Sequence, residues 1–186
     1  MGRMRFVALA FAAAFSLSGF LASASAQDVA CYESQEFRIA AQENPDSAGT
    51  TFTVTKRNDK ATKTCRFDPT TADFVIGGND DQPFWYLGLV GAKLALTAST
   101  GPAESLIVYD LERREPILNA PVTGYELGEQ AVSYWERVGE GTRANCPDFS
   151  SFTENGLEPV IAAETVFDLA SGEASRTGET RCDAMQ

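Results

Sequence analysis

The sequence predicts an all-β protein, an antiparallel β-sandwich or barrel of about 9–11 short strands with two disulfides. Three observations lead to this prediction. Short apolar or alternating segments are separated by Gly, Pro, Asn and Asp turn signals. The chain shows neither a long amphipathic helical pattern nor a repeat of fixed period. Its four cysteines form an even set, as in disulfide-bonded exported proteins.

Residues 1–26 have the pattern of a cleaved secretory signal peptide. Arg3 and Arg5 supply the positive start, an apolar run begins at Val7, and small residues at 24–26 suit a signal peptidase. A spanning helix needs about 20 predominantly apolar residues, and this run is shorter and interrupted by Ser and Gly. The sequence therefore predicts an exported protein, periplasmic or extracellular, with no membrane insertion after cleavage.

The mature chain is expected to begin at Gln27 and to carry no lipid. A lipidated cysteine would follow the apolar run directly, with an apolar residue three positions before it. Cys31 lies ten residues after Leu21, and Asp28 occupies the position that should be apolar. Cys31 is therefore interpreted as a disulfide partner.

Residues 27–186 are expected to form a single all-β domain, since 160 residues is the size of one domain. Removal of residues 1–26 takes two arginines and no acidic residue from 15 basic and 26 acidic residues, leaving a net charge of −13. Such an acidic chain lacks the basic surface that nucleic acids and anionic lipids require. The charge suits either plain solubility or a cationic partner.

The expected disulfides are Cys31–Cys65 and Cys146–Cys182, because each pair brackets a region that is predicted to fold locally. Four cysteines allow three pairings, and this one closes two loops of similar length. Zinc is not indicated, since the chain has no CxxC motif and no histidine.

The first clear strand pattern is a hairpin at residues 51–67, with Asn58-Asp59 as its two-residue turn. In that register Phe52 faces Cys65, and the apolar side chains of both arms share one face.

A second hairpin is predicted from residues 83–91 and 93–99 around Gly91, followed by a strand at 105–111 that is apolar on both faces. A short strand is expected at ILNAPV. In the strand predicted at 83–91, Trp85 and Tyr86 point to opposite faces. We interpret both as core residues; the alternative is that one of them is exposed and belongs to a recognition surface.

Residues 125–139 fit either a strand or a helix, and the alternation favours a strand. A long loop carrying Cys146 follows from Gly139 to Glu158. The chain then ends in a hairpin over 164–182 with Ser171-Gly172 as its turn, which is expected to bring Cys182 near Pro159 and Val160.

The sequence lacks the side chains of the common catalytic sites. Without histidine, Ser-His-Asp and Cys-His sites are impossible. A Ser-Lys site is disfavoured, since three of the four lysines cluster near one predicted turn. The GGNDDQ stretch at 77–82 offers only Asp80 and Asp81 as carboxylates, too few for calcium. No metal, cofactor or catalytic residue is therefore expected.

The resulting functional prediction is an exported, acidic, non-catalytic binding or inhibitory module of the cell envelope. Its partner would be a cationic envelope protein or peptide, with Trp85 or Trp135 as the candidate contact residue. The alternatives are a carboxylate-dependent hydrolase of envelope glycans and a structural or assembly component.

Overall fold

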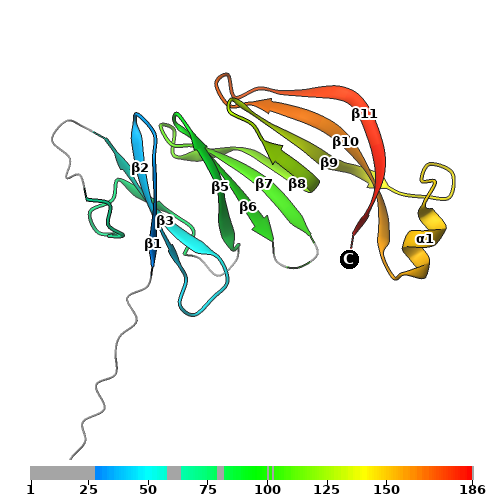
Figure 1. Ribbon diagram of the computed structural model, residues 1–186, viewed down its shortest axis with the longest axis horizontal. Coiled ribbons are helices and arrows are strands. Elements are labelled where there is room, and N and C mark those ends of the chain that lie inside the picture. Colours follow the sequence, from blue (N-terminus) through cyan, green and yellow to red (C-terminus); the bar gives the residue numbers. More distant parts are fainter. Residues whose placement is uncertain (1–27, 58–63, 79–81, 100, 102, 186) are drawn as a thin grey trace, which may run out of the picture.

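The structure is a computed structural model that describes residues 28–57, 64–78, 82–99, 101 and 103–185. Over these residues the chain forms eleven β-strands and one short helix (Figure 1). The strands build two antiparallel sheets that pack as a sandwich and do not close into a barrel. The predicted all-β fold class is confirmed.

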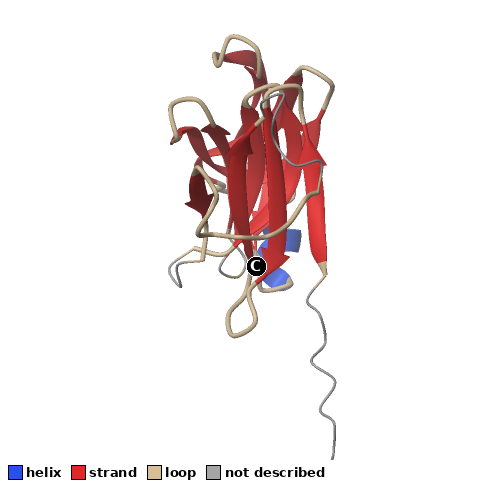
Figure 2. Ribbon diagram, turned by 90° about the vertical axis from the view of Figure 1, so that its left-hand side faces the viewer, coloured by secondary structure: helices blue, strands red, loops and turns tan. Residues whose placement is uncertain are grey.

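The smaller sheet has the strand order β1-β2-β3-β4, and the larger sheet has the order β11-β10-β9-β8-β7-β6-β5. Within each sheet consecutive strands are therefore neighbours, as expected for short turns between antiparallel strands, and the chain passes from one sheet to the other between β4 and β5. The single helix lies near one end of the strands (Figure 2). The elements are β1 (Val29–Glu33), β2 (Phe37–Glu43), β3 (Thr50–Lys56), β4 (Phe74–Ile76), β5 (Phe84–Val90), β6 (Lys93–Ser99), β7 (Glu104–Asp110), β8 (Glu115–Leu127), β9 (Ala131–Glu140), α1 (Phe149–Glu154), β10 (Glu158–Asp168) and β11 (Ala174–Met185).

The first hydrophobic core lies between the two sheets. The smaller sheet contributes alternate residues of its central strands, such as Ile39 in β2 and Phe52 in β3. These pack on Leu94 and Leu96 of β6 and on Ile107 of β7. The buried residues of this core lie in β2–β7 and at Leu111, so the smaller sheet covers the β5–β7 part of the larger one, as Figure 1 also shows.

The second core lies on the opposite face of the larger sheet, where Leu106 and Val108 pack with residues from β8, β9 and β10. The sheet curls around this core: a Cβ placed on Gly88 of β5 would lie 2.2 Å from a methyl of Leu127 at the end of β8. Ile107 is buried on one face of the larger sheet, and Leu106 and Val108 are buried on the other. This confirms the prediction of a strand covered on both faces.

Both predicted disulfides are present. Cys31 in β1 is bonded to Cys65, and Cys146 is bonded to Cys182 in β11. The second bond ties the segment before α1 to β11. Cys182 lies opposite Ile161, one residue from its predicted neighbour Val160, because β10 and β11 contain a register shift between Ala163 and Thr165.

The predicted hairpin at 51–67 is wrong in its second arm. Strand β3 pairs instead with β4, so that Phe52 lies opposite Ile76, and Thr64–Phe67 forms no regular structure. The Cys31–Cys65 bond explains the difference, since it holds Cys65 against β1 and β2, with its Sγ 3.9 Å from the Ile39 carbonyl. The predicted turn at Asn58-Asp59 lies outside the described residues.

The other hairpin predictions are confirmed. The turns at Gly91 (φ 56°) and Gly172 (φ 76°) both need a left-handed residue, which glycine tolerates without strain. The ambiguous segment 125–139 contains no helix: it is the end of β8 and most of β9, joined by a turn at 128–130 that the prediction of a strand did not include. The predicted loop after it is interrupted by the six-residue helix α1.

Two properties bear on where the protein resides. Two disulfides suit an oxidising compartment such as those that exported proteins reach. Within the described ranges, α1 falls far short of the length that a membrane-crossing helix needs.

Candidate functional site

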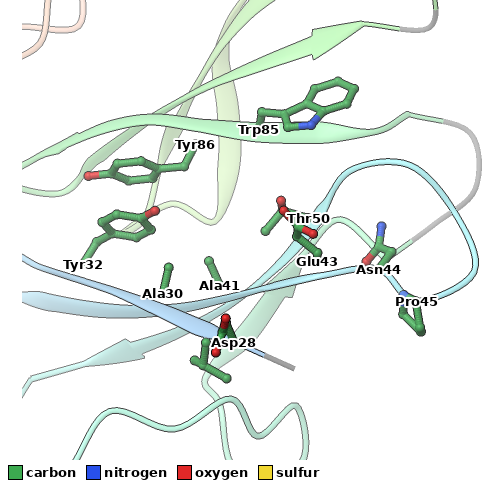
Figure 3. Close-up of a pocket in the computed structure, with 11 residues that line it drawn as sticks. Asp28, Ala30, Tyr32, Ala41, Glu43, Asn44, Pro45, Thr50, Trp85 and Tyr86 are labelled. Atoms are coloured by element: carbon green, nitrogen blue, oxygen red, sulfur yellow. The ribbon is translucent and has the colours of Figure 1, made fainter. Parts of the chain in front are cut away.

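A groove of about 810 Å³ lies where the edge strand of the smaller sheet, β1, faces the edge strand of the larger sheet, β5 (Figure 3). One wall comes from β1 and the adjoining end of β2, and the opposite wall from β5. Its lining residues are Asp28, Val29, Ala30, Tyr32, Ala41, Glu43, Asn44, Pro45, Thr50, Trp85 and Tyr86. Three segments that are distant in the sequence therefore meet at one site.

One end of the groove is closed by a pair of tyrosines. Figure 3 shows Tyr32 and Tyr86 facing one another across the gap between β1 and β5. Their ring centroids are 3.4 Å apart and their planes differ by 7°. Burial raises the pKa of Tyr86 above its ordinary value of 10, and the neighbouring Tyr32 raises it further, although a hydrogen bond from the Leu89 backbone opposes the shift. Tyr86 therefore remains a neutral phenol at physiological pH.

The turn between β2 and β3 forms the other end. Asn44 is fixed there by three hydrogen bonds: its backbone N–H donates to Gly49 O (3.0 Å), its side-chain amide donates to Ala48 O (3.2 Å), and its Oδ1 accepts from the Thr51 hydroxyl (2.6 Å). A Cβ on Gly49 would lie 2.7 Å from the Cα of Pro83. The turn therefore packs tightly against the start of β5, and this end wall is held in place.

Apolar side chains gather at the groove. Val29, Val75, Trp85 and Val138 are the large hydrophobic residues that stand exposed among those described. Two of these four, Val29 and Trp85, each 38% exposed, are among the lining residues and belong to opposite walls, and Trp85 projects from the side of β5 opposite Tyr86 (Figure 3). Exposed apolar groups that cluster, rather than scatter, mark interaction sites.

Among the described residues, the charged side chains that line the groove are all acidic. Asp28 and Glu43 line it, and none of its described lining residues is basic. Neither carboxylate takes part in an ion pair with any other described side chain, whereas most of the basic residues described elsewhere do so, for example Arg38 with Glu33 at 2.6 Å. The groove therefore offers a negative charge that the rest of the described chain leaves uncompensated.

The structure corrects the core interpretation of Trp85. In Figure 3 Trp85 and Tyr86 project from opposite sides of β5, as the alternation predicts. Only Tyr86 faces the core between the sheets. Trp85 stays exposed because β5 is an edge strand and no further strand of the described chain covers its outer flank.

Trp135, the other candidate contact residue, lies elsewhere. The guanidinium of Arg181 sits over its ring, 4.1 Å from the centroid, and Arg181 is in turn bonded to Asp183 at 2.7 Å. Asp183 also accepts a hydrogen bond from Thr123. Trp135 is therefore half-buried beneath the Arg181 guanidinium, while Asp183 links β11 to β8, and Trp135 does not line the groove.

The site shows no arrangement typical of metal binding. Over the part of the chain that the structure describes, three His, Cys, Asp or Glu side chains are nowhere grouped to hold an ion. Asp80 and Asp81, the carboxylates of the GGNDDQ stretch, lie outside that part. Within the groove, Asp28 and Glu43 are both exposed, which is unlike the buried general acid of a glycoside hydrolase.

Sequence reasoning identified the β5 side of this site and missed the β1 side. The aromatic stretch at 82–88 singled out Trp85 and Tyr86. Tyr32 and Glu43 carried no local signal, since their place at the groove depends on how the two sheets pack. Comparisons of this chain with protein-family models, with curated proteins and with solved structures find no match.

Proposed function

We propose that this protein is an exported, non-catalytic binding module of the cell envelope, which holds a cationic segment of a protein or peptide in the groove between β1 and β5. The observation that carries the proposal is the joint position of Trp85, Asp28 and Glu43 in one groove whose described lining residues include no basic side chain. An exposed tryptophan can act as an apolar anchor, and the carboxylates would attract basic side chains and speed the encounter.

Export agrees with this role. The two disulfides need an oxidising compartment to form and persist, and the proposed site of action is the periplasm or the extracellular space. Because the sulfur of Cys31 is bonded to Cys65, it is not available for a lipid thioether. Intact mass of the exported protein should correspond to a chain that begins at Gln27, and a diacylglycerol mass on Cys31 would contradict this.

The alternative of a carboxylate-dependent glycan hydrolase is supported by one feature, the presence of two carboxylates in the groove. Such an enzyme needs one carboxyl with a raised pKa, which burial or a close like charge supplies. Both carboxylates are exposed. The same groove therefore supports binding better than hydrolysis.

The test measures binding of a defined basic probe, an acetylated and amidated decapeptide of alternating lysine and valine. The control is the corresponding peptide of alternating glutamate and valine. The basic peptide should bind at low salt and weaken steeply towards physiological salt, while the acidic peptide should not bind. Trp85→Ala should weaken binding by about 2 kcal/mol or more if Trp85 is the anchor.

A pair of charge variants separates the groove from the overall charge. Asp28→Asn/Glu43→Gln should weaken binding at least tenfold at low salt. Glu154→Gln/Glu158→Gln removes the same two charges from exposed positions outside the groove and should leave affinity within about twofold. Equal losses in both variants, or no binding of the basic peptide to the unchanged protein, would refute the proposed function.

A further inference from the structure

Strand β1 is left uncovered to an unusual extent for a strand in a sandwich. Of its five residues only Tyr32 is partly buried, and the other four are exposed. Ala30 lies on the same face as Tyr32, towards the larger sheet, and is still exposed, whereas its cross-strand neighbour Ala41 in β2 is 4% exposed. The core between the sheets therefore ends beneath β2, and β1 overhangs the groove.

The backbone of β1 presents unpaired hydrogen-bonding groups along this overhang. The N–H of Ser34 donates to Phe37 O (2.9 Å), so residues 34 and 37 are a hydrogen-bonded pair. Bonded and non-bonded pairs alternate in an antiparallel ladder, so Tyr32 and Ala30 bond to β2. The N–H and C=O groups of Val29 and Cys31 must then point away from β2.

The facing edge of β5 is less suited to accept another strand. At its start, a Cβ on Gly49 would lie 2.9 Å from the Phe84 nitrogen, so the β2–β3 turn covers that edge. Farther along, the β-bulge between Tyr86 and Gly88 interrupts the regular spacing of the backbone groups of β5. Over the described residues, β1 is therefore the edge at the groove that can accept another strand.

We propose that an extended basic segment of the partner pairs with β1 and becomes a fifth strand of the smaller sheet. This inference rests on the proposed function and specifies how the groove holds its ligand. Main-chain bonds to Val29 and Cys31 would supply affinity, and alternate side chains would supply specificity. One set would cover Trp85, and basic side chains of the segment would lie near Asp28 and Glu43.

Charge decides against a second copy of this chain as the occupant. Two β1 strands could pair across a twofold axis, as free edges often do. Such a dimer would bring together two grooves in which the charged lining residues that the structure describes, Asp28 and Glu43, are both acidic. The formal net charge of each whole chain is −11. An extended basic segment has the charge that complements the groove.

The test on the protein compares Val29→Pro with Val29→Ala. Proline removes the N–H of Val29, which points away from β2, and proline is tolerated at such edge positions. Alanine removes the same side chain and keeps the N–H. Affinity for the lysine–valine decapeptide should fall at least tenfold further in Val29→Pro than in Val29→Ala, with both variants folded in a thermal melt.

The test on the peptide does not depend on how Val29→Pro folds. The N–H groups of alternate residues point to the same edge of an extended peptide. Two forms of the decapeptide, one N-methylated at its valines and one at its lysines, therefore block opposite edges. We expect one form to lose at least tenfold in affinity while the other binds like the parent. Loss in neither form, or equal loss in both, would overturn strand addition.

These outcomes are distinct from failure of the proposed function. If the N-methylated forms and Val29→Pro all bind normally while Asp28→Asn/Glu43→Gln still abolishes binding, the groove function stands and strand addition is wrong. If the parent peptide does not bind at all, both are wrong. A dimer in sedimentation velocity that Val29→Pro dissociates would show a second copy on β1 and overturn the basic-segment assignment.

Discussion

The ring of Tyr32 in β1 lies parallel to the ring of Tyr86 in β5, with 3.4 Å between their centroids. This pair joins the two sheets at their edge strands. Offset-stacked or edge-to-face aromatic pairs contribute about 0.5–1.5 kcal/mol beyond the area that they bury. The contact therefore serves both the stability of the sandwich and the shape of the groove.

Replacement of Tyr86 should expose this double role. Tyr86→Ala removes the ring contact and should lower the free energy of unfolding by about 2–3 kcal/mol, less than for a fully buried aromatic. Tyr86→Phe keeps the ring and should cost less than about 1 kcal/mol. Urea denaturation measures both. A Tyr86→Ala protein as stable as the wild type would show that the pair does not hold the sheet edges together.

Local turn chemistry accounts for what could be predicted from the sequence. The hairpins at Gly91 and Gly172 pair strands that follow one another directly in the chain, so an alternating pattern and a turn residue suffice to predict them. Strand β4 was missed because its three residues are too few to show alternation. The partner of β3 depends on a disulfide from β1, which no pattern within residues 51–67 reveals.

The groove, too, could be predicted from the sequence only in part. Its β5 side lies in one aromatic stretch and was identified, while its acidic residues, Asp28 just before β1 and Glu43 at the end of β2, lie more than 40 residues before Trp85. The exposure of Trp85 was misjudged because a sequence does not show which strand will form the edge of a sheet. These features arise from the packing of two sheets rather than from local pattern.

The two disulfides should contribute similarly to stability. They join residues separated by 34 and 36 positions, and loop-closure entropy predicts about 3–4 kcal/mol for each. We expect Cys31→Ser/Cys65→Ser and Cys146→Ser/Cys182→Ser to lose comparable free energies of unfolding in urea. Non-reduced peptide mapping of the wild type checks the pairing itself, and a peptide linking Cys31 to Cys146 would contradict the structure.

Gly141 should tolerate no side chain, whereas Gly139 should. A Cβ on Gly141 would lie 2.7 Å from the Pro159 Cβ and 2.8 Å from its backbone carbon, and nothing lies within 4 Å of a Cβ on Gly139. Gly141→Ala should therefore lose about 1–3 kcal/mol through overpacking. Gly139→Ala should be neutral or stabilising by up to about 1 kcal/mol. Melting temperatures of the two variants compare them directly, and equal values would contradict the close approach.

Asp110 should make stability depend on acid pH. Burial alone would raise its pKa, but hydrogen bonds from the backbone of Arg113 and from Lys93, with the charge of Lys93, hold the pKa below its ordinary value of 3.8. Lys93 Nζ lies 3.2 Å from its Oδ2. The ionised form is thus favoured in the folded state, so its contribution is complete above the unfolded pKa of about 4 and is lost as pH falls through the folded value.

Asp110→Asn tests this contribution. At neutral pH the variant should be less stable by about 2 kcal/mol, because it loses charge-assisted hydrogen bonds. The difference from the wild type should shrink below about pH 4, where the wild-type carboxylate becomes protonated. Urea denaturation at pH 7 and pH 3 provides both values. A difference that is constant with pH would contradict the role assigned to the charge.

The two tryptophans should report opposite local charges. Trp85 shares its groove with Asp28 and Glu43, whereas the ring of Trp135 lies under the Arg181 guanidinium. In Trp135→Phe the emission of Trp85 should be quenched better by caesium than by iodide, because the acidic groove concentrates cations. In Trp85→Phe the remaining emission should be quenched weakly and should favour iodide. Both preferences should fade as sodium chloride is raised, since salt screens exposed charges. If Asp28→Asn/Glu43→Gln in the Trp135→Phe background leaves the caesium preference unchanged, these two carboxylates do not set the potential at Trp85, and the charge argument for a basic ligand loses its foundation.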